Sequence, residues 1–155
     1  MVKVGELITR LMPKALPIPF VNVVFPLDKS PSSYHVILLD GDLSSGKTTF
    51  TKGIGKALGI KRVINSPTFT ILKNYEGTKN LNHLDLYRME GIGLDFDLEE
   101  YILDEEAIVV IEWPNRVKEL LPKTYVLVTF KWIDETTRHI TIQTSDGNDD
   151  WIKDL

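Results

Sequence analysis

Apolar residues in the middle of the chain fall into short runs separated by polar loops. Ala107–Ile111 is an uninterrupted apolar run and His35–Leu39 is nearly one, which is typical of strands buried on both faces of a sheet. Lys47–Leu58 is compatible with a helix that Gly59 would end, because glycine is favoured just past a helix C-terminus. Leu94–Leu103 carries apolar residues at helical spacing, which predicts a second helix.

Shorter patterns complete the predicted fold. Thr68–Tyr75 and Leu81–Leu84 are predicted strands. Tyr125–Phe130 and His139–Gln143 flank the polar stretch Asp134–Arg138, which predicts an antiparallel hairpin near the C-terminus. Alternation of strands and helices followed by a hairpin predicts an α/β fold with a mixed sheet.

The N-terminal stretch differs from the rest because it holds five of the eight prolines. Val4–Met12 predicts a short amphipathic helix that Pro13 would end, since residues before proline avoid helical angles. Phe20–Phe25 predicts a strand and Leu27–Ser33 a loop. We interpret the chain as a single domain spanning residues 1–155, with residues 1–33 as an atypical Pro-rich segment.

Composition excludes several classes of function. The 155 residues carry a formal charge of −4 and no cysteine. The charge argues against a self-sufficient nucleic-acid binder, which needs a clustered basic face. The missing cysteines exclude disulfides, thiolate zinc sites and cysteine nucleophiles. Apolar runs fall short of the roughly 20 residues that span a bilayer, and Lys3, Glu6 and Arg10 interrupt the N-terminal apolar stretch. We therefore expect a cytoplasmic protein without membrane association.

A phosphate-binding loop is the strongest motif of the chain. Residues 41–48 match G-x-x-x-x-G-K-[ST], between a predicted strand and a predicted helix. In that context backbone N–H groups converge on an anion, Lys47 supplies charge to the β- and γ-phosphates, and the Thr48 hydroxyl binds magnesium. A Gly/Ser turn with a solvated Lys47 is the disfavoured alternative. The predicted nucleotide-binding residues are Gly41, Asp42, Leu43, Ser44, Ser45, Gly46, Lys47, Thr48 and Thr49.

The preferred base is inferred from an absence. Guanine-binding proteins of this superfamily usually carry Asn-Lys-x-Asp after a strand, and the sequence contains no such tetrad. We therefore expect ATP, with Mg²⁺, as the bound nucleotide.

Two acidic residues follow predicted strands, where α/β sheets bind ligands. Glu112 directly follows the run Ala107–Ile111 and is the candidate magnesium ligand; a solvent-facing glutamate is its alternative. Asp85 follows Leu81–Leu84 and is a candidate for acting on the attacking water, although a capping or turn aspartate is equally compatible. The candidate catalytic residues are Lys47, Asp85 and Glu112.

Three neighbouring features have weaker interpretations. His83 is interpreted as structural, because a lone histidine beside apolar residues is usually a core residue. Ser66-Pro67-Thr68-Phe69 is either a switch segment that senses the γ-phosphate or a tight turn entering a strand. The acidic run between Asp95 and Glu106 is interpreted as the solvated face of a helix.

Four motifs occur together in a family-specific order. They are Gly-Asp-Leu-x-x-Gly-Lys-Thr-Thr-Phe (41–50), Ser-Pro-Thr-Phe (66–69), His-x-Asp-Leu-Tyr-Arg (83–88) and Ile-Glu-Trp-Pro (111–114). Over about Val36 to Pro122 the chain resembles the TsaE (YjeE) family, bacterial P-loop ATPases of tRNA modification. The resemblance implies a P-loop NTPase-like three-layer α/β fold with a mixed sheet and a C-terminal antiparallel hairpin.

The resemblance also implies partners and residue roles. Family members assist the proteins TsaB and TsaD, which form threonylcarbamoyladenosine beside the anticodon of tRNA, so tRNA would be met mainly through partners. By motif position, Lys47 would hold phosphates, Thr48 and Glu112 would hold magnesium, Asp85 would lie near the γ-phosphate, and Trp113 would lie beside the metal carboxylate.

The chain departs from the family pattern at three places. Ser44 and Ser45 stand where the family usually has Gly and then Ala. Only a short Pro/Ser loop joins Phe20–Phe25 to His35–Leu39, where the family places a helix. The usual Gly-Arg near the terminal hairpin is missing, and the candidate stretch for an approach to the base is Asp134–Arg138.

The leading hypothesis is therefore an ATP hydrolase, slow alone, that assists a TsaB–TsaD complex. One alternative is a small-molecule kinase on the same core. Such enzymes need lid arginines, and the five arginines of this chain are not clustered in sequence: Arg10, Arg62, Arg88, Arg116 and Arg138. The other alternative is a nucleotide-gated interaction module without turnover.

Overall fold

The structure is a computed structural model that describes residues 5–10, as backbone only, together with residues 34–89 and 97–150. The strand predicted at Phe20–Phe25 and the loop predicted at Leu27–Ser33 lie outside these residues. Among the helices in the described ranges, none is long and apolar enough to cross a bilayer.

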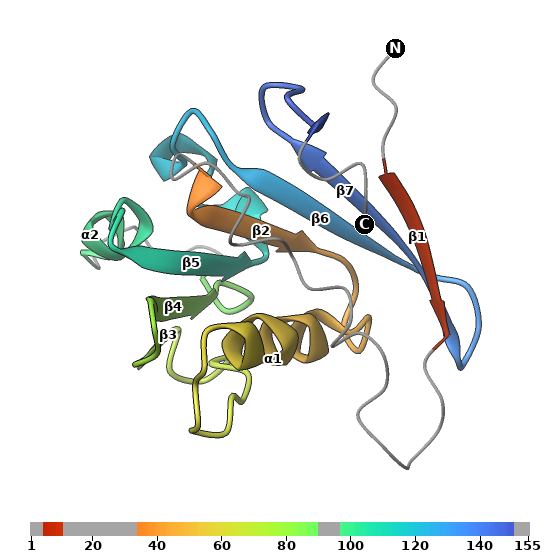
Figure 1. Cartoon of the computed structure of the whole chain (residues 1–155), viewed down its shortest axis with the longest axis horizontal. Helices are drawn as coiled ribbons and strands as arrows, with labels where there is room; N and C mark the ends of the chain where they lie inside the picture. The colour runs from red at the N-terminus through yellow and green to blue at the C-terminus, as the bar shows by residue number, and fades with distance from the viewer. Residues whose placement is uncertain (1–4, 11–33, 90–96, 151–155) are drawn as a thin grey trace.

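A mixed sheet forms the centre of the molecule (Figure 1). Within the described ranges it has seven strands in the order β1-β7-β6-β2-β5-β4-β3. β2 pairs in parallel with both β5 and β6, and β4 pairs in parallel with β5. The pairs β1·β7, β6·β7 and β3·β4 are antiparallel. The strands are β1 Gly5–Arg10, β2 Val36–Asp40, β3 Leu72–Tyr75, β4 Asn80–Asp85, β5 Ala107–Glu112, β6 Val126–Trp132 and β7 Thr137–Thr144.

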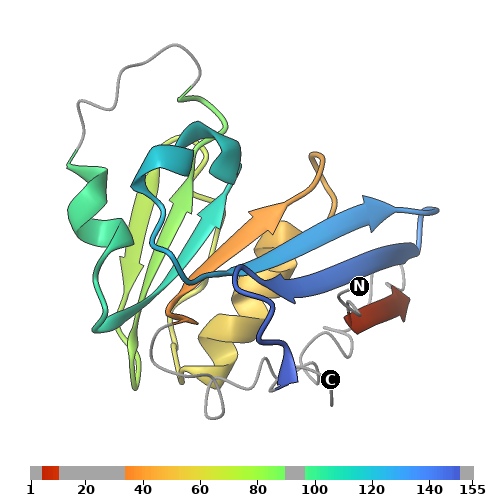
Figure 2. The same cartoon turned by 90° about the horizontal axis from the view of Figure 1, so that it is seen from above.

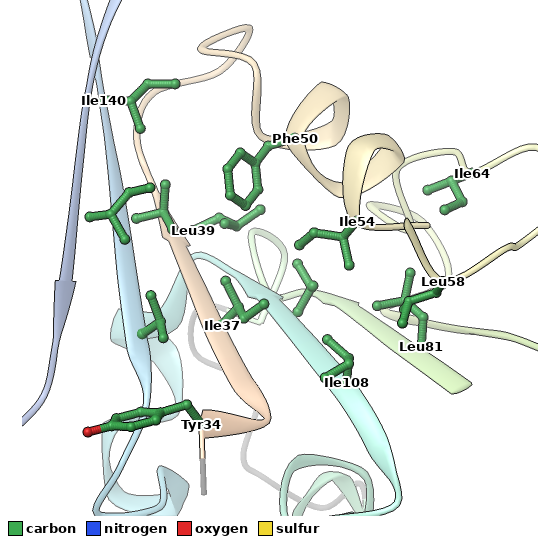
Figure 3. Close-up of a cluster of buried hydrophobic side chains, with 14 of the residues drawn as sticks. Tyr34, Ile37, Leu39, Phe50, Ile54, Leu58, Ile64, Leu81, Ile108 and Ile140 are labelled. Atoms are coloured by element: carbon green, nitrogen blue, oxygen red, sulfur yellow. The ribbon is translucent and has the colours of Figure 1, made fainter. Parts of the chain in front are cut away.

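Helices cover both faces of the sheet, which gives the predicted three layers (Figure 2). The helix α1 (Lys47–Ala57) packs on one face through Phe50 and Ile54, together with its C-cap residue Leu58 (Figure 3). The helix α2 (Leu98–Ile102) packs on the opposite face, together with Val117. Because β2 and β5 are buried on both faces, their apolar runs are continuous rather than alternating.

The predicted organisation around the central strands is confirmed. β2, α1 and β5 agree with the predicted elements to within a residue at each end. β6 and β7 form the predicted antiparallel hairpin, with Val126 opposite Thr144 and Trp132 opposite Arg138. The loop between β2 and α1 therefore has the strand–loop–helix context that a phosphate-binding motif needs.

The prediction of an N-terminal helix over Val4–Met12 is wrong. Gly5–Arg10 is instead the strand β1, which pairs antiparallel with β7 from Gly5 opposite Ile142 to Arg10 opposite Thr137. A helix of about nine residues is marginal by itself in water. A ladder of hydrogen bonds to an otherwise unpaired sheet edge therefore outweighs the local helical pattern.

The strand predicted from Thr68 begins four residues later, at Leu72. The backbone N–H groups of Thr70 and Ile71 both donate to Pro67 O, at 2.9 and 2.7 Å. Ile71 adopts a positive φ of 67°. A turn therefore separates the Ser66–Phe69 motif from β3, and the motif is not part of the strand.

The parallel strands bring three motifs to one edge of the sheet. The phosphate-loop motif begins directly after β2, Asp85 is the last residue of β4, and Glu112 is the last residue of β5. The β4–β5 register places Asp85 opposite Glu112, and the β2–β5 register places Leu39 opposite Glu112. This carboxyl edge is where parallel sheets bind ligands.

Candidate functional site

A cavity of about 240 Å³ opens at this carboxyl edge. Its walls come from the phosphate-loop motif, the Ser66–Thr68 segment and the ends of β4 and β5. The lining residues are Leu43, Ser44, Ser45, Gly46, Lys47, Thr48, Thr49, Ser66, Thr68, Asp85, Tyr87, Glu112 and Trp113.

Most of the sequence-predicted site residues meet at this cavity. Of the nine predicted loop residues, Gly41 and Asp42 do not line it. Their carbonyl oxygens instead accept hydrogen bonds from Lys47. Both predicted acids, Asp85 and Glu112, line the cavity and are buried.

The N-terminus of α1 is built to receive an anion. Gly46 is its N-cap, in the left-handed region with φ 109°, and no side chain caps the helix. The first turn also holds no acidic residue. The free N–H groups and the positive end of the helix dipole are therefore left for a ligand at the cavity wall.

Gly41 permits a close approach of the loop to β6. A Cβ atom at this position would lie 2.9 Å from the Cβ and O atoms of Phe130 and from Ser45 Oγ. Phe130 is buried and packs edge-on against Phe50 of α1, so it has little room to move. Any larger residue at position 41 therefore displaces the loop or the strand.

We expect Gly41→Ala to lower the free energy of unfolding by about 1–3 kcal/mol, the usual cost of overpacking a filled site. Urea unfolding followed by circular dichroism measures this loss. Gly147→Ala is the comparison, because Gly147 has a φ of 76° but no atom within 4 Å of the added Cβ. It gives the cost of a left-handed φ without a steric contact, about 1 kcal/mol, whereas Gly41 has a φ of 157° and a backbone cost of its own. Equal free energies of unfolding for the two variants would show that a Cβ atom at position 41 causes no costly contact with Phe130.

Lys47 lies at the centre of the site. Its Nζ donates to Gly41 O at 2.6 Å and to Asp42 O at 2.8 Å. The same ammonium lies 4.8 Å from the centroid of the Trp113 ring, a cation–π contact. The loop carbonyls and the indole thus hold the cation at the cavity.

The electrostatic environment of Lys47 has two opposing parts. Burial lowers the pKa of Lys47 below its ordinary value, whereas the nearby carboxylates of Glu112 and Asp85 raise it. Hydrogen bonds from an ammonium to an anionic oxygen are stronger than those to neutral carbonyls, so an anion at the cavity could replace the loop carbonyls as partners of Nζ.

Glu112 is held by a residue that the sequence analysis assigned to the core. His83 Nε2 lies 2.8 Å from Glu112 Oε1, and both side chains are buried. His83 is therefore both a core residue and a direct neighbour of a candidate site residue. A single sequence does not show this, because the contact depends on the register between β4 and β5.

Asp85 is more fully engaged than the sequence indicated. Its Oδ2 accepts hydrogen bonds from Ser66 Oγ at 3.0 Å and Thr68 Oγ1 at 2.6 Å. Its Oδ1 accepts from the backbone N–H of Tyr87 at 3.1 Å. Asp85 therefore performs the turn role that was one of its two interpretations, and it also anchors the Ser66–Thr68 segment at the cavity.

Two aromatic residues form a further wall. Trp113 adopts a positive φ of 59°, and its ring lies 5.0 Å from that of Tyr87, centroid to centroid. Trp113 directly follows Glu112 in the sequence, and both residues line the cavity. Tyr87 was missed as a lining residue, although it stands two positions after Asp85 in the same motif.

The terminal hairpin reaches the loop through Arg138. Its guanidinium donates to Asp134 O at 2.6 Å and to Ser44 O at 3.4 Å. Ser44 itself has a φ of 62°, in the left-handed region where the family's usual glycine is favoured. Arg138, the last residue of the Asp134–Arg138 stretch, thus contacts the phosphate loop at Ser44, one of the positions where the chain departs from the family pattern.

Fold and site together define the class: this is an α/β protein of P-loop NTPase type, with a mixed sheet and a terminal hairpin. The chain belongs to the TsaE family, because the model of that family, described as threonylcarbamoyl adenosine biosynthesis protein TsaE, matches residues 21–140.

Individual relatives agree with this family assignment. The tRNA threonylcarbamoyladenosine biosynthesis protein TsaE of Bacillus subtilis is 44% identical over 114 residues, which are 73% of this chain and 71% of that protein. The protein of the same name from Nostoc is 42% identical over 127 residues, which are 79% and 78% of the two chains. The crystal structure of Bacillus subtilis YdiB superimposes with a TM-score of 0.64 at 32% identity, covering 92% of this chain and 86% of that one.

Proposed function

We propose that the protein binds ATP with Mg²⁺ and hydrolyses it, and that this cycle assists a TsaB–TsaD complex in forming threonylcarbamoyladenosine in tRNA. The family assignment supports the pathway. The observation that carries the ATPase proposal is the cavity in which Lys47, Thr48 and Glu112 meet at the N-terminus of α1.

In this proposal the triphosphate occupies the N-terminal end of α1. The loop from Gly41 to Thr49 surrounds it with N–H groups, and Lys47 exchanges its bonds to the Gly41 and Asp42 carbonyls for phosphate oxygens. The exchange costs little desolvation, because Lys47 is already buried. The absence of an Asn-Lys-x-Asp tetrad supports adenine as the base.

The donor set at the cavity fits magnesium only when phosphate is also bound. Within the described residues, no group of three or more His, Cys, Asp or Glu side chains could hold a metal ion. One carboxylate, from Glu112, and one hydroxyl, from Thr48, do line the cavity. Mg²⁺ is typically held by one or two protein oxygens together with waters and nucleotide phosphates. When bound, the ion would neutralise charge on the phosphates.

Asp85 is proposed to act at the γ-phosphate end through the segment it anchors. Its carboxylate fixes the hydroxyls of Ser66 and Thr68 at the cavity wall. Hydroxyls fixed in this way can orient a phosphate oxygen or an attacking water, which is how phosphoryl-transfer sites gain rate without covalent chemistry.

The proposed partners follow from charge as well as from the family. A chain with a formal charge of −4 is poorly suited to bind tRNA by itself. We therefore propose that it meets tRNA mainly through TsaB and TsaD. Co-purification of the chain with candidate TsaB and TsaD proteins, with and without ATP, tests this; no association in either state would contradict it.

We expect slow ATP hydrolysis by the isolated chain and faster turnover when the partners are added. Among the described arginines, none lines the cavity: Arg138 contacts loop backbone and Arg88 stacks on the exposed Phe69 ring. Among the described residues, Lys47 is therefore the one cationic side chain that lines the cavity, and beyond it and Mg²⁺ the site has no positive group to stabilise the transition state. Phosphate release measured with and without partners tests the expectation. Turnover by the isolated chain at kinase rates, about 1–100 per second, would contradict it.

A further inference from the structure

We propose that His83 is a positioning residue that orients the Glu112 carboxylate toward the cavity and thereby sets the affinity for Mg²⁺. The proposal rests on the proposed function, since it assigns a role toward the metal of that site. It differs from the sequence interpretation, in which His83 is only part of the core.

The contact between the two residues is direct and fully buried. His83 has no exposed surface, and its Nε2 lies 2.8 Å from Glu112 Oε1. Both residues belong to neighbouring parallel strands, β4 and β5, whose register fixes their separation. Rotation of the Glu112 carboxylate is therefore restrained by one specific partner.

The hydrogen-bond inventory of His83 explains the direction of the bond. Nδ1 is buried and has no hydrogen-bond partner among the described residues. The tautomer with hydrogen on Nε2 donates to Glu112 and leaves only a lone pair at Nδ1. The opposite tautomer would bury an N–H without an acceptor and would turn a lone pair toward a carboxylate. His83 therefore acts as a donor to Glu112.

This hydrogen bond engages one of the two oxygens of the Glu112 carboxylate. Glu112 Oε1 is used by His83, while the carboxylate also lines the cavity beside Lys47 and Thr48. Hydrogen bonds to metal-binding carboxylates fix their orientation, and removing such a partner typically costs 10–100-fold in metal affinity. Asp85 is held differently, because its oxygens accept hydrogen bonds from Ser66, Thr68 and Tyr87 and none from His83 is involved.

The test compares two substitutions of similar size. His83→Gln places an amide N–H where Nε2 lies, and His83→Met fills the same space without a donor. Calorimetry of ATP binding in EDTA and in Mg²⁺ gives the magnesium coupling, defined as the ratio of the two dissociation constants. We expect His83→Met to lower this coupling by about 10–100-fold, with metal-free ATP affinity unchanged. His83→Gln should keep the coupling close to that of the unsubstituted protein.

Two further measurements separate positioning from stability. Melting temperatures without ligand report any loss of packing, and a purely structural role would lower them while leaving magnesium coupling unchanged. In a Glu112→Ala background, His83→Met should lower the coupling no further, because His83 acts through Glu112. If His83→Met does not fold, His83→Asn replaces it, since the shorter amide does not reach Oε1.

The outcomes distinguish a failure of the proposed function from a failure of the positioning role of His83. If the unsubstituted protein shows no magnesium coupling, the proposed function fails. If coupling depends on Glu112 but is the same in the Gln and Met variants of His83, only the positioning role is overturned. An additive loss in the double variant would also overturn it, because His83 would then act independently of Glu112.

Discussion

Replacing Lys47 with alanine is expected to weaken ATP binding by about 100-fold or more. The substitution removes the buried ammonium that would contact the phosphates, and loss of a partner to a buried charge costs about 3–5 kcal/mol, where each 1.4 kcal/mol is a factor of ten in affinity. Isothermal titration calorimetry with ATP and Mg²⁺ measures the effect directly.

The Lys47 substitution also removes bonds within the loop, so a control is needed. Nζ holds the Gly41 and Asp42 carbonyls in the free protein, and its loss lowers loop order as well as phosphate contact. Lys52→Ala is the matched control, because Lys52 is exposed on the same helix and does not line the cavity. Unchanged ATP affinity of the folded Lys47 variant would remove the phosphate-loop argument.

The central strands and the loop could be predicted because their signals are local. The apolar run of β5 is long enough to be recognised as a doubly buried strand, and Gly41, Gly46 and Lys47 stand at fixed spacing from the end of β2 to the first residue of α1. The hairpin of β6 and β7 was predicted for the same reason, since both strands and their turn are adjacent in sequence.

Features that depend on distant pairing could not be predicted. β1 is a strand because it pairs with β7, yet the paired residues Gly5 and Ile142 are far apart in the chain. The contact of His83 with Glu112 depends on how β4 and β5 align, and apolar patterns do not give strand register. Local sequence predicts a carboxylate at a strand end, whereas the neighbours of that carboxylate come from the fold.

The two acids at the cavity have different surroundings, which gives them different expected roles. Glu112 is bound on one side by His83 and lies near Lys47, so it remains a ligand candidate. Asp85 accepts hydrogen bonds from Ser66, Thr68 and Tyr87, so its substitution changes the position of a segment. The same residue chemistry at two strand ends thus serves different purposes.

We expect Glu112→Ala to raise the Mg²⁺ concentration needed for tight ATP binding by about 100-fold or more. Loss of the hydrogen-bond partner of a metal-binding group alone costs 10–100-fold, and loss of the ligand itself should cost at least as much. Trp113 follows Glu112 and contacts Lys47, so its fluorescence reports occupancy. Phenylalanine at Trp132 and Trp151, the other tryptophans of the sequence, leaves Trp113 as the single fluorophore.

Asp85→Ala should instead leave ATP affinity and magnesium demand close to normal and slow hydrolysis by about 100-fold or more, the usual contribution of a group that acts on the attacking water. Its loss frees the Ser66 and Thr68 hydroxyls from the cavity wall, while Lys47 and the helix N-terminus still hold the phosphates. Phosphate release in the presence of the partners measures the loss, and circular dichroism confirms that each variant is folded. Glu100→Ala, at an exposed position of α2, controls for the loss of a negative charge. Normal magnesium dependence and turnover in the Glu112 variant would place the metal carboxylate on the other strand, at Asp85.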